Sequence, residues 1–208
     1  AYEIVSRDWS SDVCSSDLAG CSIILRPAEE APACVAALVQ CFRDAGVPPG
    51  VINLIFGPAE AVVAPLMKAH SVRMCSFTGS TRVGQILIKQ SAETLKRVHM
   101  ELGGHAPVMV YEDADITKLA AAAAAGKTRS SGQVCTSPSR FFVHSKVHDE
   151  FVDKFVKRSE KIVVGDPLET KSQIGPLAYE AHMKRVLSYV DVARQDGAEV
   201  LTGGSRHS

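Results

Sequence analysis

Two short segments of the chain combine residue types that could carry out chemistry. The first is Gly-Gln-Val-Cys at residues 132–135, where Cys135 follows a glycine-bearing loop. A cysteine acts as a nucleophile when its thiolate is accessible and an acid or base lies nearby. The second is Glu-Leu-Gly-Gly at residues 101–104, whose Glu101 is the acid that could serve Cys135. Taken singly, Cys135 also fits a buried apolar side chain, and Glu101 fits a carboxylate at the end of a strand.

A third segment, Phe-Thr-Gly-Ser-Thr at residues 77–81, could bind a phosphate group. It joins an expected strand to an expected helix, and the free N–H groups at a helix start favour an anion. Gly79 would allow close approach of the backbone, and Ser80 would add a hydroxyl donor. A plain N-cap at Ser80 or Thr81 explains the same residues without any ligand.

The elements that must position these segments follow from an alternation of short apolar runs with helical patterns. We expect strands over residues 21–25, 51–56, 72–77, 96–102, 106–111, 140–143 and 199–201. We expect helices from Pro27 to Gly46, over 59–68, from Thr81 through Ile88, from Asp113 or Asp115 to Gly126, and over 147–162 and 179–195. The alternation predicts an α/β protein with a mostly parallel sheet.

Composition excludes several functional classes. The 208 residues include 23 Lys and Arg against 23 Asp and Glu, so there is no basic footprint for nucleic acid. No uncharged apolar run reaches the 18 residues that a membrane-spanning helix requires. The six cysteines show neither a Cys-x-x-Cys pair nor zinc spacing with histidine, so we expect no metal site. They are interpreted as reduced thiols, mostly in the core, of a cytoplasmic protein.

The first 17 residues differ in character from the rest of the chain. Residues 5–17 are rich in serine and aspartate, repeat Ser-Ser-Asp and lack helical or strand periodicity. We interpret residues 1–17 as a non-native leader, with a natural surface loop as the alternative, and leave them out of the fold prediction.

Taken together, the three motifs resemble those of the NAD(P)-dependent aldehyde dehydrogenase superfamily, in which they occur in the same order. Further matching segments are Ile-Leu-Arg-Pro-Ala-Glu at 24–29, Gly-Val-Pro-Pro-Gly-Val-Ile-Asn at 46–53, Val-Gly-Asp-Pro at 164–167 and Gly-Pro at 175–176. The resemblance covers residues 18–204. Residues 26–32 and 136–142 are most similar to the succinate-semialdehyde dehydrogenase-like branch.

The resemblance implies roles for two of these residues in catalysis. Cys135 would be the nucleophile, whose thiolate attacks the aldehyde carbon to give a thiohemiacetal and, after hydride transfer to the nicotinamide, a thioester. Glu101 would activate the water that hydrolyses the thioester. The backbone N–H of Cys135 would be one donor to the oxyanion. Arg140 could face a substrate carboxylate, as a semialdehyde such as succinate semialdehyde would require, and the alternative is an arginine at a strand start that lies in solvent or in an ion pair.

The resemblance also implies a cofactor site. The pyrophosphate would lie near Gly79 and Ser80, with Phe77, Leu102 and Gly103 in the segments beside it. Gly57 would make room near the adenine. Arg26 and Glu29 would contact the adenosine ribose, although Arg26 stands where the family usually has lysine. Because Glu29 would accept bonds from the ribose hydroxyls and repel a 2′-phosphate, we expect NAD rather than NADP.

In fold terms, the resemblance implies a Rossmann-like NAD-binding domain over residues 18–102 and the first part of an α/β catalytic domain over 103–208, truncated at both ends. The chain lacks the segments that supply the oxyanion-hole asparagine, the Glu-x-Phe-Gly-Pro motif and the oligomerisation strands of the family. We therefore expect this chain alone to be inactive and its parent protein to be a homo-oligomer.

Two other functions compete with this interpretation. A non-catalytic member of the same fold could bind or support other molecules, although it would have no need to keep both Cys135 and Glu101. A cofactor-independent cysteine hydrolase or acyltransferase would need a histidine close to Cys135 in the fold. His105 is the candidate nearest to a motif.

Overall fold

The computed structural model of the chain describes residues 2–6 and 20–207, with side chains from residue 20 onward. The chain divides into two compact units, Ala1–Gly103 and Gly104–Ser208, and each is described here by itself.

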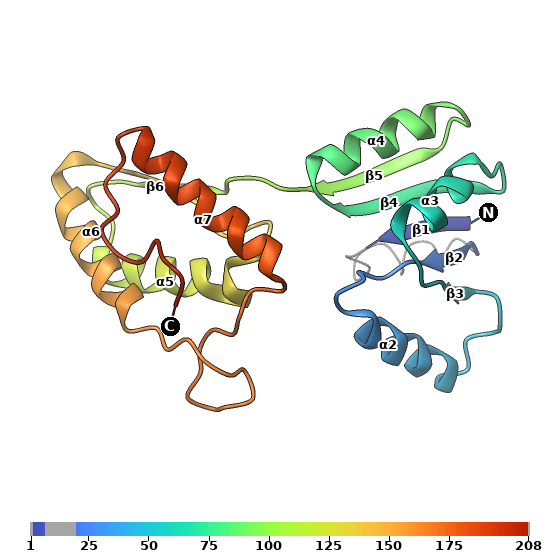
Figure 1. Ribbon diagram of the computed structural model, residues 1–208, viewed down its shortest axis with the longest axis horizontal. Coiled ribbons are helices and arrows are strands. Elements are labelled where there is room, and N and C mark those ends of the chain that lie inside the picture. The colour runs from blue at the N-terminus through green and yellow to red at the C-terminus, as the bar shows by residue number, and fades with distance from the viewer. Residues whose placement is uncertain (1, 7–19, 208) are drawn as a thin grey trace. The chain divides into compact units, whose positions relative to one another are not determined.

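The first unit contains a five-stranded parallel sheet. Its strands, in the spatial order β3-β2-β1-β4-β5, are β3 (Ile52–Leu54), β2 (Ser22–Leu25), β1 (Tyr2–Ser6), β4 (Val72–Gly79) and β5 (Arg97–Leu102) (Figure 1). This is the order of a doubly wound nucleotide-binding sheet, in which ligands bind outside the carboxyl ends of the strands. The predicted α/β class is therefore confirmed for this unit.

Strand β1 was missed by the sequence analysis, which left the first 17 residues out of the fold prediction. Residues 2–6 form the central strand, paired with β2 on one side and β4 on the other. Residues 7–17, the remainder of the expected leader, lie outside the described residues.

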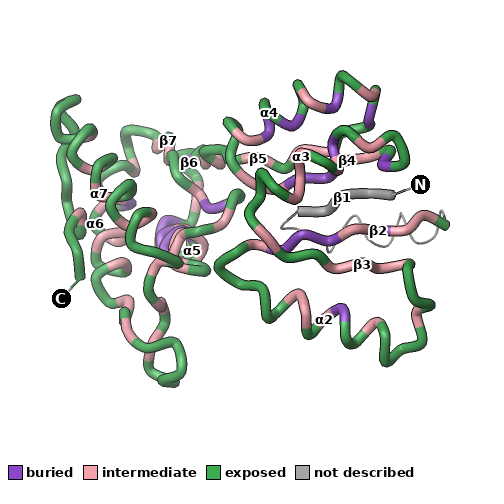
Figure 2. The backbone as a smooth tube through the Cα atoms, turned by 45° about the vertical axis from the view of Figure 1, so that its right-hand side comes forward, coloured by how far each residue is buried: buried purple, intermediate pink, exposed green. Residues whose placement is uncertain are grey.

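Helices α2 (Pro32–Asp44), α3 (Ala59–Lys68) and α4 (Thr81–Ala92) connect these strands. Ile23 and Leu25 of β2 pack with Val39 of α2. Cys75 and Phe77 of β4 pack in a second cluster with Met67 of α3 and Leu87 of α4. The register Ile4↔Ile24 and Ile4↔Cys75 places Cys75 on the opposite face from Ile23 and Leu25. The helices thus cover both faces of the sheet, and Figures 1 and 2 show buried β2 and β4 between α2 and α4.

The start of α2 corrects one sequence prediction. We expected the helix to begin near Pro27, with acidic residues in its first turn, whereas it begins at Pro32 and has no acid in that turn. Both prolines suit the first helical position, where no N–H is needed. Pro32 takes it because a helix running on from Pro27 would place Pro32 in its interior, where the ring clashes with the carbonyl of Ala28 and no N–H is available.

Lys96 is a buried lysine whose side chain joins the start of β5 to the connection between α3 and β4. Its residue is only 7% exposed, and its Nζ donates to the carbonyl oxygens of Ala69 at 2.6 Å and Val72 at 2.8 Å. Burial, with a smaller contribution from Arg73, lowers the pKa of Lys96 below its ordinary value. The side chain therefore ties the segment just before β5 to the segment between α3 and β4.

The second unit is built on two parallel strands, β6 (Pro107–Val110) and β7 (Arg140–Val143). Helices α5 (Ile116–Thr128), α6 (Ser145–Glu160) and α7 (Glu180–Gln195) complete it. The core joins Val110 to Ile116, Ala120 and Ala123 of α5 and to Phe151 of α6. The rings of Phe141, Phe151 and Phe155 pack with centroids 5.5–5.6 Å apart.

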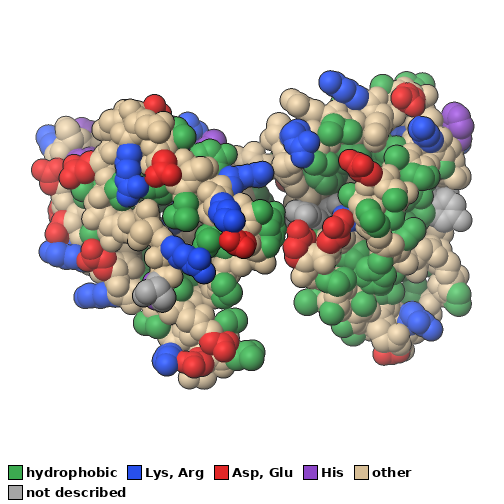
Figure 3. All heavy atoms as spheres, in the orientation of Figure 1, with side chains coloured by type: hydrophobic (Ala, Val, Ile, Leu, Met, Phe, Trp, Pro, Cys, Tyr) green, Lys and Arg blue, Asp and Glu red, His purple; other side chains and the backbone are tan. Residues whose placement is uncertain are grey.

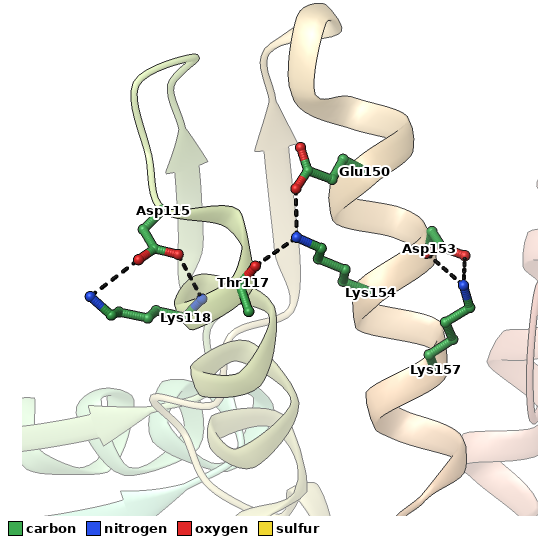
Figure 4. Close-up of polar contacts among 7 residues, drawn as sticks. All are labelled: Asp115, Thr117, Lys118, Glu150, Asp153, Lys154 and Lys157. Atoms are coloured by element: carbon green, nitrogen blue, oxygen red, sulfur yellow. Dashed lines mark hydrogen bonds and ion pairs between the residues drawn. The ribbon is translucent and has the colours of Figure 1, made fainter.

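Polar contacts link the start of α5 to the middle of α6 (Figure 4). Asp115 is the N-cap of α5, and its carboxylate accepts from the Lys118 N–H at 3.1 Å. This bond and the Lys118 ammonium hold the pKa of Asp115 below its ordinary value. From α6, Lys154 Nζ donates at 2.6 Å both to Thr117 Oγ1 and to Glu150 Oε1. The expected capping role of Asp115 is thus confirmed, and Lys154 links the two helices.

Two further observations concern the surface and the end of the chain. Residues 199–201, expected to be a strand, have no strand structure and pair with neither β6 nor β7. Large apolar side chains also lie on the surface of both units, with Leu95 and Leu168 each 91% exposed (Figure 3). In residues 2–6 and 20–207, no helix has the length and apolar character needed to cross a membrane.

Candidate active site

Cys135 lies in a tight turn in the second unit. The N–H of Ser137 donates to the carbonyl oxygen of Val134 at 3.0 Å, so Cys135 and Thr136 occupy the two central positions of a four-residue turn. The residue is exposed and its thiol is not in a disulfide. Among the described residues, no hydrogen bond joins Cys135 to a histidine, and the arrangement that a Cys–His hydrolase requires is not formed with His105. The thiol is therefore open to a reactant from solvent.

The chain reaches this turn through an unusual left-handed segment. After α5, the 3-10 turn Arg129–Gly132 places three consecutive residues at positive φ: Ser130 at 49°, Ser131 at 56° and Gly132 at 76°. Positive φ is uncommon for serine, whose Cβ crowds the backbone there. Gly132 meets the requirement without strain, and a Cβ on it would lie 3.3 Å from the Lys127 carbonyl oxygen. The glycine of the motif is thus needed for the chain reversal before Cys135.

Two side chains fasten this reversal to a distant segment of the same unit. Ser131 Oγ donates to the Gly175 carbonyl at 2.8 Å. Gln133 Oε1 accepts from the Ala178 N–H at 3.2 Å, while its Nε2 donates to the Ser130 carbonyl at 3.2 Å. Sequence reasoning did not single out Ser131 or Gln133. The Gly-Pro match at residues 175–176 was the available signal, because this segment forms the other side of the contact.

A pocket of about 920 Å³ lies in the second unit but does not include Cys135. Ser131 and Gly175 contribute to its wall, together with apolar residues between 164 and 187 and the end of the described chain at 205–207. We therefore do not assign this pocket to the reacting aldehyde.

Glu101 lies near the carboxyl end of β5 in the first unit. It pairs in register with Thr78 of β4, and its side chain is 58% exposed. His99 Nε2 lies 3.0 Å from Glu101 Oε1. The spacing of two residues on one strand is the signal that could have revealed this partner, because such residues lie on the same face. Glu101 and Cys135 belong to different units, so their meeting remains a prediction.

The segment between β4 and α4 has an ordinary capping geometry. Ser80 is the N-cap of α4, and its Oγ accepts from the Val83 N–H at 3.4 Å. The capping alternative is therefore confirmed for Ser80. Glycine was expected at position 79 to let the backbone approach a phosphate. In the structure it is required because the ring of Phe77 occupies the space that a Cβ would take. First-turn N–H groups of α4 other than that of Val83 have no acceptor within the helix and still suit an anion.

Leu102 and Gly103 lie beside this turn at the end of β5. Leu102 pairs in register with Gly79, and its Cδ2 would lie 2.8 Å from a Cβ on Gly84. Gly103 has no neighbouring atom within 4 Å of its own Cβ position, so the backbone there is open. These residues thus gather where β4 and β5 end, as expected.

Three of the expected cofactor residues are brought together by direct contacts. Arg26, which follows β2, donates through Nη2 to Glu29 and to the Gly57 carbonyl oxygen, the latter at 2.9 Å. Gly57 has a φ of +148°, a conformation that favours glycine. Arg26 Nε is buried and has no hydrogen-bond partner among the described residues. An orphaned buried donor beside an exposed carboxylate, at the carboxyl ends of β2 and β3, fits the adenosine end of a dinucleotide.

Arg140 begins β7 in the second unit and is exposed. Its Cζ lies 5.8 Å from the centroid of the Phe142 ring, a cation–π arrangement. The pairing of Pro107 with Arg140 holds it at the strand start. Across the described residues, no group of three His, Cys, Asp or Glu side chains is placed to hold a metal ion.

Comparison with known proteins shows to which family this chain belongs. The profile of the aldehyde dehydrogenase family matches residues 10–208. The chain belongs to this family. A succinate-semialdehyde dehydrogenase [NADP(+)] of Schizosaccharomyces pombe is 45% identical over 188 residues, which cover 89% of this chain and 38% of that protein. A non-phosphorylating aspartate-semialdehyde dehydrogenase of Halomonas elongata is 40% identical over 190 residues, covering 91% of this chain and 38% of the relative.

Solved structures of this family agree with the fold. The NAD-dependent aldehyde dehydrogenase of Sinorhizobium meliloti has a TM-score of 0.95 and 36% identity, over 99% of this chain and 42% of that chain. An Escherichia coli NADP-dependent enzyme also reaches a TM-score of 0.95 at 36% identity, over 99% and 44% of the two chains. The predicted family and fold class are confirmed. The chain spans about two-fifths of the length of the aldehyde dehydrogenases that it matches.

Proposed function

We propose that the protein to which this chain corresponds oxidises an aldehyde to a carboxylic acid with NAD, through Cys135 and Glu101. The observation that carries the proposal is the exposed thiol of Cys135 in a turn held by Ser131 and Gln133. Family membership supports the proposal. In domain terms, residues 18–102 would bind the cofactor and residues 103–208 would begin the catalytic domain.

The proposed reaction begins at the thiolate of Cys135. The thiolate attacks the aldehyde carbon, the C–S bond forms, and the carbonyl electron pair moves to oxygen. The backbone N–H of Cys135 donates to this oxyanion. Loss of a hydride from the same carbon restores the carbonyl and leaves a thioester on Cys135. NAD, when bound, supplies the acceptor for that hydride.

Glu101 completes the cycle in this proposal. Its carboxylate removes a proton from water as the oxygen attacks the thioester carbon. The C–S bond then breaks, which releases the carboxylic acid and restores the Cys135 thiolate. His99, 3.0 Å from Glu101, would hold the carboxylate in place between turnovers.

Substrate and cofactor preference are finer parts of the proposal. Relatives named as succinate- and aspartate-semialdehyde dehydrogenases support a semialdehyde substrate, with Arg140 as the candidate partner of its second carboxylate. Residues at the ends of β2 to β5 would hold the dinucleotide: Arg26, Glu29, Gly57, Phe77, Gly79, Ser80, Leu102 and Gly103. We propose NAD as the preferred cofactor because Glu29 exposes a carboxylate at the ribose end. A homo-oligomeric parent and a cytoplasmic location remain predictions.

The test replaces the corresponding segment of the S. pombe relative with residues 20–207 of this chain. We expect the purified chimera to produce NADH from succinate semialdehyde and the 208-residue chain alone to produce none. Cys135→Ser should abolish turnover in the chimera, and Cys34→Ser, at another exposed thiol, should not. Glu101→Gln should keep a first burst of NADH and slow later turnovers, because acylation precedes the step that needs the base. A folded, cofactor-binding chimera without activity would overturn the proposal and favour a non-catalytic member, and activity that survives Cys135→Ser would overturn the role of Cys135.

A further inference from the structure

A second, smaller pocket lies in the second unit, where the end of α5 meets the end of α6. Its volume is about 330 Å³, and Cys135 does not line it. The charged residues in its wall are Arg129, Arg158 and Lys161, and no aspartate or glutamate lines it. In a chain whose acidic and basic residues are equal in number, this pocket therefore holds a local excess of three positive charges.

The three cations of this pocket are unpaired. Their residues are exposed, and none of the three makes a hydrogen bond or ion pair with another described residue. Other lysines of α6 are neutralised locally, because Lys154 pairs with Glu150 at 2.6 Å and Lys157 pairs with Asp153 at 2.7 Å (Figure 4). The unpaired cations of α6 are thus found at the end of the helix that lines the pocket.

The spacing of these cations is unfavourable without a counter-ion. Arg158 and Lys161 are three residues apart at the end of α6, where like charges repel one another. Glu160 lies between them in sequence, but its Oε1 accepts from Thr202 Oγ1 at 3.2 Å and it does not line the pocket. The two helix ends supply only about half a negative charge each, so the three cations exceed what the helix dipoles can neutralise.

The uncharged part of the wall suits a small organic molecule. Gln173 Oε1 accepts from the Val163 N–H at 2.9 Å, which leaves the Gln173 Nε2 as a further donor. Ala124 and Ile162 add apolar surface. The volume lies at the lower end of the range for small-molecule sites, which is larger than a bare ion needs.

We propose that this pocket binds a phosphorylated small molecule, with its phosphate on Arg129, Arg158 and Lys161 and its carbon part against Ala124 and Ile162. A phosphate monoester carries nearly two negative charges at neutral pH and offers three acceptor oxygens, so it matches three cations better than a single carboxylate does. The two guanidinium groups bind phosphate oxygens through their planar forks, and the ammonium acts as a point charge. The site is separate from the reaction at Cys135 and does not depend on the proposed function.

The test measures binding of phenyl phosphate to the 208-residue chain by calorimetry, in a phosphate-free buffer at one fixed ionic strength. We expect binding at a single site. Inorganic phosphate should bind more weakly because it makes no contact with the apolar wall, and phenol should show no binding because it lacks the phosphate. Arg158→Gln and Lys161→Gln should each weaken phenyl phosphate binding by about tenfold, the usual size of one charge-assisted contact.

Two control variants separate this pocket from a general effect of charge and from the candidate active site. Lys157→Gln removes the same charge from α6 at a residue that is paired with Asp153 and does not line the pocket. Cys135→Ser alters the candidate nucleophile, which also lies outside the pocket. We expect both variants to bind phenyl phosphate as the unaltered chain does. All the substituted residues are exposed, so the variants should fold, and circular dichroism checks this.

Several results would overturn the inference. They are a folded chain that does not bind phenyl phosphate, inorganic phosphate that binds as tightly as the ester, and a loss in Lys157→Gln equal to that in Lys161→Gln. Binding that is abolished by Cys135→Ser would place the anion at the candidate active site instead of this pocket. Oxidation of an aldehyde by Cys135 and Glu101 is tested separately by the chimera, so either proposal can fail while the other stands.

Discussion

The phenyl ring of Phe77 fills the space in which a Cβ of residue 79 would lie. The two residues are separated by one position on β4, so their side chains belong on the same face of the strand. Phe77 is itself buried in the cluster of Met67, Cys75 and Leu87 and cannot easily move away. The glycine at the end of β4 is therefore a packing requirement of the core.

Gly79→Ala should destabilise the first unit by about 1–3 kcal/mol, the usual cost of overfilling a packed site. Urea unfolding of the isolated chain measures this free energy. Gly104→Ala is the matched control, because no atom lies within 4 Å of its Cβ position. Combining Gly79→Ala with Phe77→Leu should recover part of the loss. An unchanged unfolding midpoint in Gly79→Ala would show that the ring is not held as described.

The left-handed conformation of Ser130 predicts a stabilising substitution. A residue with a Cβ pays about 1–2 kcal/mol in this region, and asparagine tolerates it best after glycine. Ser130→Asn should therefore stabilise the chain by up to about 1 kcal/mol, read from the urea midpoint. Ser131→Asn provides the contrast, because that change also removes the 2.8 Å bond to the Gly175 carbonyl. Equal gains in both variants would contradict the assigned role of Ser131.

The cap at Asp115 predicts a specific dependence of stability on pH. Its folded-state pKa lies below the ordinary value of 3.8, so its stabilising contribution is complete above that value and disappears as the pH falls through the folded pKa. Asp115→Ala should lower the melting temperature near neutral pH, and the gap to the unaltered chain should shrink as the pH falls below 3.8. Asp115→Asn should lower the melting temperature less, because the asparagine side chain can still accept a hydrogen bond from the Lys118 N–H. A gap that stays constant with pH would assign the effect to something other than ionisation.

The two carbonyl bonds of Lys96 predict a large loss when its ammonium is removed. Lys96→Met keeps the length of the side chain but leaves the carbonyls of Ala69 and Val72 without their donor. The expected cost is about 1–3 kcal/mol in chemical unfolding. Lys89→Met, on the exposed surface of α4, should change stability little. A neutral Lys96→Met variant would mean that water replaces the ammonium at both carbonyls.

Sequence patterns predicted the elements that carry strong periodicity or clear punctuation. Strand β7 was predicted with its observed bounds, and the Asp115 cap of α5 was one of two named candidates. The predicted start of α2 was wrong because Pro27 and Pro32 both suit a first helical turn, and a start at Pro27 would have left Pro32 in the helix interior. Strand β1 was missed because residues 1–17 were excluded as a leader on the composition of residues 5–17, whereas residues 2–6 pair with residues 22–25 and 72–77.

In the candidate site, too, the sequence revealed some features and not others. Cys135, Glu101 and the cofactor residues were accessible through short motifs and their order. The contacts that hold these residues could not be predicted, because the hydrogen bonds of Gln133 with Ala178 and of Arg26 with Gly57 span long separations in sequence. The expectation that most cysteines lie in the core was wrong for the described ones, of which only Cys75 is buried. The presence of a cysteine does not by itself show whether the residue lies on a helix surface, as Cys34 does, or in the core, as Cys75 does.

The central position of β1 has a consequence for how the chain assembles during synthesis. Residues 2–6 are synthesised well before their neighbour on one side, β4, whose last residue is Gly79. The sheet therefore cannot close until β4 has emerged, and parallel pairing across so long a sequence separation is slow. Until then the nascent strand has an unsatisfied edge, for which chaperones and neighbouring nascent chains would compete.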